Sequence, residues 1–384
     1  MQRERAAYIH VPFCVSKCYY CDFNSYPGLD AMFQSYTDAV RKEISGTGLE
    51  TRAATLYIGG GTPTVLSAQQ VSALVEAVRI RLALAGDAEA TIEANPATIG
   101  QAELEALITA GINRISFGVQ SFDDHLLKRI GRRHTAADAR QAVIDGRLVG
   151  FKNISLDLIY ALPGQSVEGW GETLQQAISL APEHISLYEL TIEEGTPFSE
   201  LLAQGSLELP EEELQIDMYA GAESALEAAG YERYEISNFA MPGFRCRHNQ
   251  FYWRNDEYYG FGAGAVSYID GRRARNVKSP AEYIERVRET GSAVGSVEEL
   301  SPERRLGETM MLGLRMADGV DCAEIETRFG VDPRRFYEAE IDRLLGQRLV
   351  EFCDTRLRLT RRGVLLANEA MAEFVRPVEK AGAS

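Results

Sequence analysis

The chain has 384 residues, of which 45% are hydrophobic and 25% are charged, the composition of an ordinary soluble globular protein. This length predicts one large barrel or sheet domain and a smaller second domain. Forty Lys and Arg residues against 56 Asp and Glu residues give a net charge of -16, which argues against nucleic acid as a partner because such a surface repels phosphate.

Six cysteines in a chain of this size do not form a secreted disulfide scaffold, so we expect a reducing, cytoplasmic setting. Residues 1–13 lack the apolar segment of a signal peptide. The most apolar long stretch, residues 71–86, carries Glu76, Arg79 and Arg81 at helical spacing. It therefore predicts an amphipathic helix and no membrane span.

The first 240 residues alternate between short β-rich segments and longer helical patterns. Strands are predicted at 7–11, 55–60, 90–95, 114–120, 153–160 and 184–190, and helices at 31–45, 67–85, 101–110, 135–149 and 166–181. Six successive βα units imply a parallel sheet, either doubly wound or curled into a barrel. In barrels the reacting groups lie at the C-terminal ends of the strands, where this chain has its unusual residues.

The first predicted strand is followed by "CVSKCYYC", in which Cys14, Cys18 and Cys21 have the spacing C-x3-C-x2-C. Thiolates bind zinc or iron–sulfur clusters. A structural zinc site normally has a second cysteine pair, which is missing here, whereas a [4Fe–4S] cluster on three cysteines leaves one iron open to a small molecule. Three unrelated buried cysteines are the remaining alternative, although Ser16 and Lys17 are polar for a core strand.

Other strand ends carry candidate ligand-binding residues. "GGGTP", residues 59–63, follows the second strand, where a glycine run predicts either a tight turn or a backbone that a ligand approaches closely. Glu93 ends the third strand and is either an ordinary carboxylate or a partner for ligand hydroxyl groups. Gln120, Asp157 and Thr191 lie in or after the fourth to sixth strands. Equivalent positions at successive strand ends predict one shared site.

An aromatic and glycine-rich stretch, residues 231–269, follows a predicted helix at 210–229 and contains "CRHNQFYW". Histidine and cysteine are common axial ligands of haem, so His248 and, less favoured, Cys246 are candidates. Aromatic side chains beside them would stack on a porphyrin, and Arg245 and Arg247 would meet its propionates. The alternative is an aromatic corner of the core in which His248 is hydrogen-bonded and uninvolved.

From Ser301 the pattern changes to helices at 301–316 and 334–350, a hairpin turning at Asp354 and Thr355, and a final helix. This order resembles a winged-helix module, and we favour docking over DNA binding for it. We expect domain limits of 1–235 for the barrel, 236–300 for the aromatic segment and 301–384 for the C-terminal module.

The spacing C-x3-C-x2-C after a first strand resembles the signature of the radical S-adenosylmethionine (SAM) superfamily. That resemblance implies an α/β fold, a partial (β/α)6 TIM-like barrel with a smaller winged-helix-like C-terminal module. It also implies a [4Fe–4S] cluster on the three cysteines. The SAM-binding residues that it implies are Tyr8, Tyr20, Gly60, Gly61, Thr62, Glu93, Gln120, Arg132, Asp157, Thr191 and Val266.

Nearly the whole chain resembles the subgroup of oxygen-independent coproporphyrinogen III oxidases and their relatives. The oxidases have a fourth cysteine where this chain has Phe23, and an N-terminal extension for which no room remains before a strand starting at about Ala7. "HNQFYW" instead resembles the HNxxYW motif of the HemW haem chaperones. This resemblance implies a haem site formed by His248, Asn249, Tyr252 and Trp253, with Cys246 as a substitute ligand.

The function implied is a haem chaperone, which binds haem and delivers it to haem-requiring proteins, including membrane-bound ones, without a need for SAM cleavage. The alternatives are the oxidase, which decarboxylates coproporphyrinogen III to protoporphyrinogen IX, and a radical SAM enzyme with another substrate. A homodimer stays open, since no self-complementary segment stands out.

Overall fold

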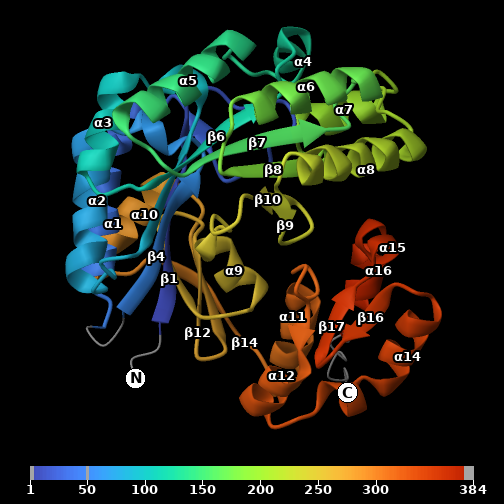
Figure 1. The fold of residues 1–384 in the computed structure, drawn as a ribbon. Coiled ribbons are helices and arrows are strands. Elements are labelled where there is room, and N and C mark those ends of the chain that lie inside the picture. Colours follow the sequence, from blue (N-terminus) through green and yellow to red (C-terminus); the bar gives the residue numbers. More distant parts are fainter. Residues whose placement is uncertain (1–3, 49–51, 376–384) are drawn as a thin grey trace.

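The computed structural model describes residues 4–48 and 52–375, and its centre is a wall of six parallel strands (Figure 1). All six strands predicted from the sequence are present. They follow the order β1, β4, β5, β6, β7, β8 across the sheet, with bounds Glu4–Val11, Arg52–Gly60, Glu89–Ala94, Arg114–Gln120, Ile154–Tyr160 and His184–Glu189. The α/β fold with a partial (β/α)6 barrel is confirmed.

Further strands extend both edges of this wall into a 12-stranded sheet. β11 (Tyr258–Phe261) pairs parallel to β1, and β12 (Val266–Ile269), β13 (Arg272–Asn276) and β14 (Val294–Glu299) follow antiparallel. β10 (Asn238–Ala240) and β9 (Glu232–Arg233) lie antiparallel beyond β8. In the described residues the two edges do not pair, so the barrel is open. The division of the chain at residues 235 and 300 stays a prediction.

Helices cover the outer face of the sheet (Figure 1). Ser67 and Gln70 form a capping box at the start of one predicted helix, and Thr135 caps another that ends at Gly150 with φ +109°. The predicted helices are α1 Phe33–Ser45, α2 Ala68–Arg81, α3 Gln101–Thr109, α5 Ala136–Val149, α6 Val167–Ser179 and α8 Glu212–Ala228.

Several further elements were not predicted, most of them because they are too short to show an apolar period. They are α4 Asp124–Arg129, α7 Pro197–Ala203, α9 Arg247–Trp253, α10 Pro280–Thr290, the paired strands β2 Phe13–Cys14 and β3 Tyr26–Pro27, and the 3-10 turns at Asp30–Met32, Pro63–Val65 and Pro96–Thr98. No helix in residues 4–48 and 52–375 is both long enough and apolar enough to cross a membrane.

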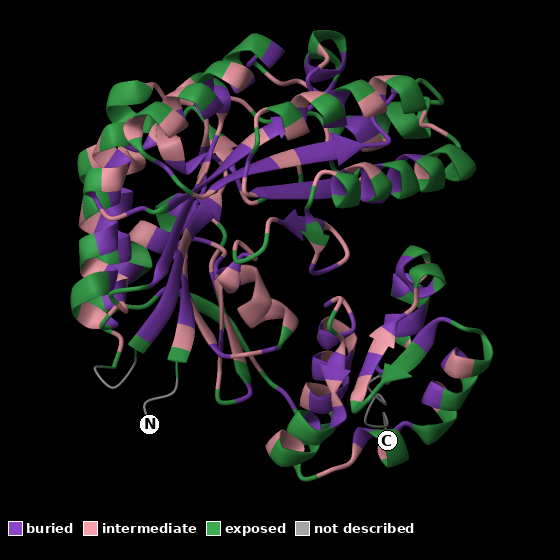
Figure 2. Ribbon diagram, viewed as in Figure 1, coloured by how far each residue is buried: buried purple, intermediate pink, exposed green. Residues whose placement is uncertain are grey.

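The strands are buried on both faces, but the two faces differ in chemistry (Figure 2). Aliphatic residues such as Leu56, Ile92 and Ile115 face the helices. The alternate residues point to the barrel interior and are polar, as strand alternation requires. This inner set comprises Thr55, Tyr57, Glu89, Thr91, Glu93, Arg114, Ser116, Ser155, Asp157, His184 and Ser186.

The C-terminal module contains the predicted hairpin, β16 Val350–Cys353 with β17 Arg356–Leu359, and β15 (Val320–Asp321) joins it to form a small sheet. The backbone N–H of Ala317 donates to the carbonyl of Tyr234 at 2.9 Å, and Arg315 pairs with the buried Glu235, so the module is joined to the barrel. Its helices are α11 Pro302–Gly313, α12 Cys322–Phe329, α13 Pro333–Phe336, α14 Glu338–Gly346, α15 Arg361–Leu365 and α16 Ala367–Ala372.

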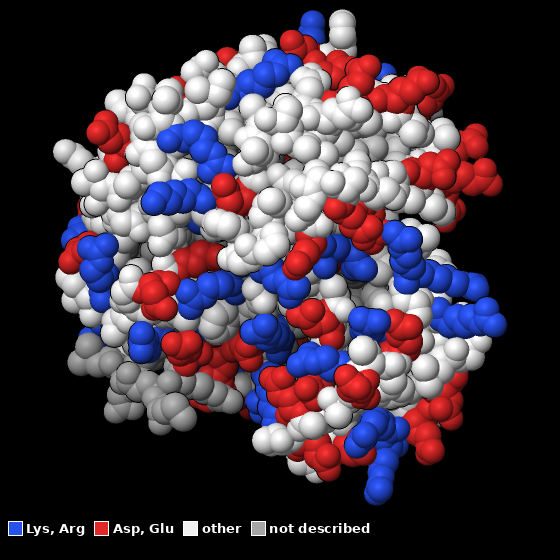
Figure 3. Space-filling model, viewed as in Figure 1, with Lys and Arg blue, Asp and Glu red and all other residues white. Residues whose placement is uncertain are grey.

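The negative charge of the chain is confined to one part of the fold. Residues 153–232 contain sixteen Asp and Glu and no Lys or Arg, which leaves 40 acidic and 40 basic residues elsewhere. Figure 3 shows acidic side chains gathered over the ends of α6, α7 and α8. The excess charge therefore lies in the middle of the chain, in the segment that contains the last two parallel strands, β7 and β8.

We predict opposite stability effects for two glycine-to-alanine changes. In α15, a Cβ at Gly363 would overlap the carbonyl oxygen of Leu349, whereas a Cβ at Gly171 in α6 meets nothing within 4 Å. We therefore expect Gly363→Ala to destabilise the C-terminal module by about 2 kcal/mol and Gly171→Ala to stabilise the chain by up to about 1 kcal/mol. Urea unfolding of both variants tests this, and equal effects would contradict the packing at Gly363.

Candidate functional site

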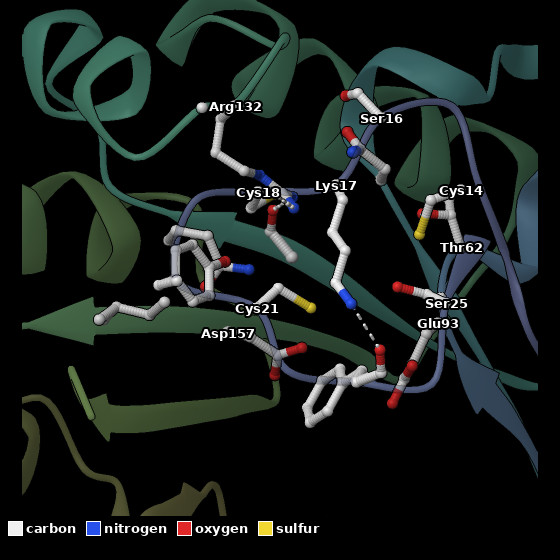
Figure 4. Close-up of a pocket in the computed structure, with 18 of the residues that line it drawn as sticks. Cys14, Ser16, Lys17, Cys18, Cys21, Ser25, Thr62, Glu93, Arg132 and Asp157 are labelled. Carbon is white, nitrogen blue, oxygen red and sulfur yellow. Dashed lines mark hydrogen bonds between the residues drawn. The ribbon is translucent and has the colours of Figure 1, made fainter. Parts of the chain in front are cut away.

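A cavity of about 610 Å³ opens at the C-terminal ends of the parallel strands (Figure 4). Its size suits a small ligand. Tyr8, whose hydroxyl bonds to His10, and Val266 on β12 do not line it. The predicted residues that do line it are Cys14, Cys18, Cys21, Tyr20, Gly60, Gly61, Thr62, Glu93, Gln120, Arg132, Asp157 and Thr191.

The three cysteines surround one space in this cavity (Figure 4). The hydroxyl of Thr62 donates to the sulfur of Cys14 at 3.5 Å, and the Arg132 guanidinium donates to that of Cys18 at 3.6 Å. Both contacts bring a hydrogen-bond donor to a cysteine sulfur at the cavity wall. Among the described residues no three His, Cys, Asp or Glu side chains are arranged to hold a single metal ion. In an iron–sulfur cluster each cysteine binds a different iron, so this donor set fits a cluster better than zinc.

The "GGGTP" turn is fastened to the cysteine segment through its backbone. The N–H groups of Gly61 and Thr62 donate to the carbonyls of Val11 and Phe13 at 2.9 and 2.7 Å. A Cβ at Gly61 would lie 2.9 Å from the sulfur of Cys14, so no larger residue fits there. These two amides are therefore engaged, and so are the carbonyls of Thr62 and Pro63, which accept from the N–H groups of Val65 and Leu66.

Glu93 accepts hydrogen bonds with both carboxylate oxygens. The Tyr57 hydroxyl donates to Oε1 at 2.8 Å, and the Gly60 N–H donates to Oε2 at 3.0 Å. Burial raises the pKa of Glu93 to about 7, although the Tyr57 bond opposes this, and the charge of Asp157 adds to it. The carboxyl group thus lies at the cavity wall with a pKa near neutral pH.

Below the cavity, Arg114 is 2% exposed at the start of β6. Burial alone would lower its pKa, but the acidic groups near it, first the Cys246 thiol and then the Glu89 carboxyl, raise the pKa above the usual value. The same cation, after burial, lowers the pKa of His248 to about 3. The floor of the barrel therefore holds a cation beside neutral imidazole.

The motif "HNQFYW" forms most of α9, and its histidine is enclosed. His248 is 1% exposed. Its Nδ1 lies 2.9 Å from the Thr55 hydroxyl, its Nε2 lies 3.2 Å from the Tyr252 hydroxyl, and its ring packs 5.0 Å from that of Tyr57. Both ring nitrogens are thus hydrogen-bonded in this conformation, the arrangement expected for an aromatic corner of the core. The haem assignment of these residues stays a prediction.

Glu89 holds the start of α9 against the barrel. Its carboxylate accepts from the backbone N–H groups of Arg247 and His248, both at 3.0 Å, and from the sulfur of Cys246 at 3.4 Å. Burial raises the pKa of Cys246 to about 12, so this thiol stays protonated and donates. A carboxylate at a helix N-terminus is stabilised by the free N–H groups there.

The other end of α9 contacts the C-terminal module. The Arg315 guanidinium lies 4.4 Å from the centre of the Trp253 ring, and its charge is balanced by the fully buried Glu235. Asn249 and Tyr252 lie on the same helix, so the structure brings together the four predicted motif residues, and Cys246 directly precedes them.

Tyr57, Thr55, Glu89 and Arg114 were missed as site residues. The signal was present in the alternation of the strands, since most inward positions of β4, β5 and β6 that are not Ala or Gly are polar or aromatic, whereas the outward positions are largely aliphatic. A polar residue at each inward position indicates a hydrogen-bonded interior, but sequence alone does not say which groups pair.

Comparison with known proteins places this arrangement in a family. Residues 8–177 match the model of the Radical SAM superfamily, and residues 300–366 match that of the HemN C-terminal domain. The chain is 39% identical to "Heme chaperone HemW" of Bacillus subtilis, with 97% of this chain and 99% of that protein covered. It is 35% identical to the protein of the same name from Escherichia coli, with 96% and 97% covered.

The fold is also similar to a solved structure, that of the Escherichia coli coproporphyrinogen III oxidase HemN, described as a radical SAM enzyme. The TM-score is 0.85 at 25% sequence identity, with 97% of this chain and 90% of that chain covered. The similarity extends through the C-terminal module, so the two proteins share an architecture over nearly their whole length.

We predict that Cys14→Ala abolishes cluster assembly. Removing one of three thiols leaves two ligands, too few to hold the cluster, so the broad absorption near about 400 nm should be lost after anaerobic reconstitution. The matched control is Cys353→Ala, an exposed cysteine in the hairpin of the C-terminal module. Retention of the band and of bound iron in Cys14→Ala would contradict the ligand assignment.

A second prediction concerns pH and stability in the cluster-free chain. Between about pH 4.5 and 7 the folded chain keeps a proton on Glu93 that the unfolded chain releases. The stability that this proton provides is complete below the lower value and is lost as the pH rises through about 7, a change on the order of 2–3 kcal/mol.

Glu93→Gln should remove this dependence. As the pH rises from 5 to 8, the wild type should therefore lose stability relative to the variant. Urea unfolding at both pH values measures the difference. Glu105→Gln, a change at an exposed residue of α3, should leave the wild-type dependence intact. An unchanged pH dependence in Glu93→Gln would show that the carboxyl group is already ionised at pH 5.

Proposed function

The chain belongs to the HemW family of the radical SAM superfamily, and on that basis we propose that it is a haem chaperone. It binds haem, transfers it to haem-requiring proteins, and carries a [4Fe–4S] cluster and SAM. The supporting observation is a three-thiol cavity and an HNxxYW helix in one barrel, in a chain aligned with HemW proteins over nearly its whole length. We further propose a cytoplasmic location and recipients that include membrane-bound proteins, with homodimer formation as an open question.

The residues of the cavity fit the cofactors that the family implies. Cys14, Cys18 and Cys21 would hold the cluster, and Glu93 would accept hydrogen bonds from SAM, for which it has lone pairs left. When bound, this pair supplies one-electron chemistry. Arg132, half-buried at the cavity wall and hydrogen-bonded to the Cys18 sulfur, would balance the charge of the thiolates.

Haem is the cargo, and the enclosed position of His248 sets a condition on its binding. An iron atom can bind to the imidazole only after Nδ1 or Nε2 gives up its contact with Thr55 or Tyr252. Tyr252 lies on α9 itself, so Nε2 is freed by a turn of the Tyr252 side chain, whereas Nδ1 is freed by a shift of α9 away from Thr55 on β4. Haem uptake through His248 therefore requires a local rearrangement at α9.

Titration of the reconstituted chain with haem tests this proposal. We expect one haem per chain by visible absorption, and at least about tenfold weaker binding in His248→Gln, which keeps a hydrogen-bonding side chain. His184→Gln is the matched control, because His184 is also buried and bonded, to Ser155 and Tyr234, but lies outside α9. Absence of stoichiometric haem binding would contradict the chaperone function, while equal binding by His248→Gln would contradict only the ligand.

The oxidase is tested in a separate assay, because the solved structure with the same architecture is an oxidase. The reconstituted chain is incubated with coproporphyrinogen III, SAM and a reductant. We expect no protoporphyrinogen at enzyme-like turnover. Its formation would favour the oxidase over the chaperone.

A further inference from the structure

Tyr57, which neither the superfamily signature nor HNxxYW includes, touches both candidate sites. We propose that Tyr57 is a positioning residue that couples the SAM cavity to α9, so that SAM binding and haem binding affect each other. The effect on haem binding rests on the proposed function, whereas the coupling between the cavity and α9 does not.

On the cavity side, Tyr57 acts through Glu93. Glu93 lines the cavity and Tyr57 does not, yet the Tyr57 hydroxyl donates to Glu93 Oε1 at 2.8 Å. The position of this contact depends on Gly59, where a Cβ would lie 2.9 Å from the Tyr57 ring and 3.0 Å from the Glu93 carboxylate. The first glycine of "GGGTP" therefore leaves room for the tyrosine–glutamate pair, and a ligand held by Glu93 acts on the tyrosine directly.

On the side of α9, the Tyr57 ring packs against His248. The ring centres are 5.0 Å apart at an interplanar angle of 31°, and Tyr8 lies 6.2 Å from Tyr57 and 6.4 Å from His248. The three rings form one layer between the cavity and the helix. Thr55, two residues before Tyr57 on β4, bonds to the same histidine at 2.9 Å. Strand β4 therefore holds His248 at two points and Glu93 at two points, through Tyr57 and Gly60.

Because these side chains are in mutual contact, they couple the SAM cavity to α9. In a layer of rings in mutual contact, of which His248 is buried and Tyr8 and Tyr57 are half-buried, a displacement at one side is transmitted to the other. Release of His248 for haem needs the layer to loosen, whereas a SAM molecule bound to Glu93 holds the carboxylate and, through it, Tyr57. We therefore expect SAM to oppose haem binding, and by linkage haem must weaken SAM binding by the same factor.

The test measures haem affinity of the reconstituted chain with and without saturating SAM. In the wild type SAM should raise the Kd for haem by about fivefold or more. Tyr57→Phe keeps the ring but loses the hydroxyl, so this factor should fall to about one. Tyr258→Phe is the matched control, because the Tyr258 ring meets that of Tyr252 edge to face, with ring centres 4.6 Å apart, on the side of α9 away from Glu93. It should keep the wild-type factor.

A second readout needs no haem. Amide hydrogen exchange in residues 247–253 should slow when SAM is added to the wild type and to Tyr258→Phe, but not when it is added to Tyr57→Phe. Equal protection in Tyr57→Phe, or none in the wild type, would overturn the role of Tyr57. SAM-dependent protection in a chain that fails to bind haem would leave this role in place and contradict the haem chaperone.

Discussion

The carboxylate of Glu89 fixes the relation between the barrel and the helix that closes it. Buried polar groups need partners, and the inner face of this sheet is polar at nearly every position. Two backbone N–H groups of α9 satisfy Glu89, while Arg114 beside it keeps the site neutral overall. Because α9 supplies these partners, its side chains have to lie against the barrel floor, and His248 then reaches Thr55 on the neighbouring strand. The buried position of the motif follows from the polarity of the barrel.

This arrangement makes β4 the element common to both sites. Its inward residues hold His248, its C-terminal turn is bonded to the cysteine segment, and Gly60 and Tyr57 hold the two oxygens of Glu93. The glycines of "GGGTP" are accordingly required by close contacts within the chain itself. Gly60, for example, has φ +118°, and a Cβ there would lie 2.6 Å from the His10 ring. Even without a ligand, the turn requires glycine.

The sequence was sufficient for the parts of the fold that repeat. The six parallel strands and their helices follow from alternating βα patterns, and the hairpin turn at Asp354 and Thr355 was predicted correctly. The added strands β11 to β14 were not predicted, because β13 is rich in arginine and its pairing is long-range. Most predicted SAM-binding residues do line one cavity, since strand ends meet in space. The enclosure of His248 was one of two alternatives that the sequence left open, because the choice depends on Glu89, more than a hundred residues earlier.

The position of the aromatic layer also bears on the choice between carrier and oxidase. Chemistry on a porphyrinogen would have to take place in the cavity lined by the three cysteines, where the residues that would hold the cluster lie. His248 lies on the other side of Tyr57 and Glu93 from that cavity. A cargo held through His248 would therefore be separated from the cavity by these two side chains, an arrangement that suits the proposed carrier better than an oxidase. The cavity edge carries Phe23, 62% exposed, at the position where the oxidases that the chain resembles have a fourth cysteine.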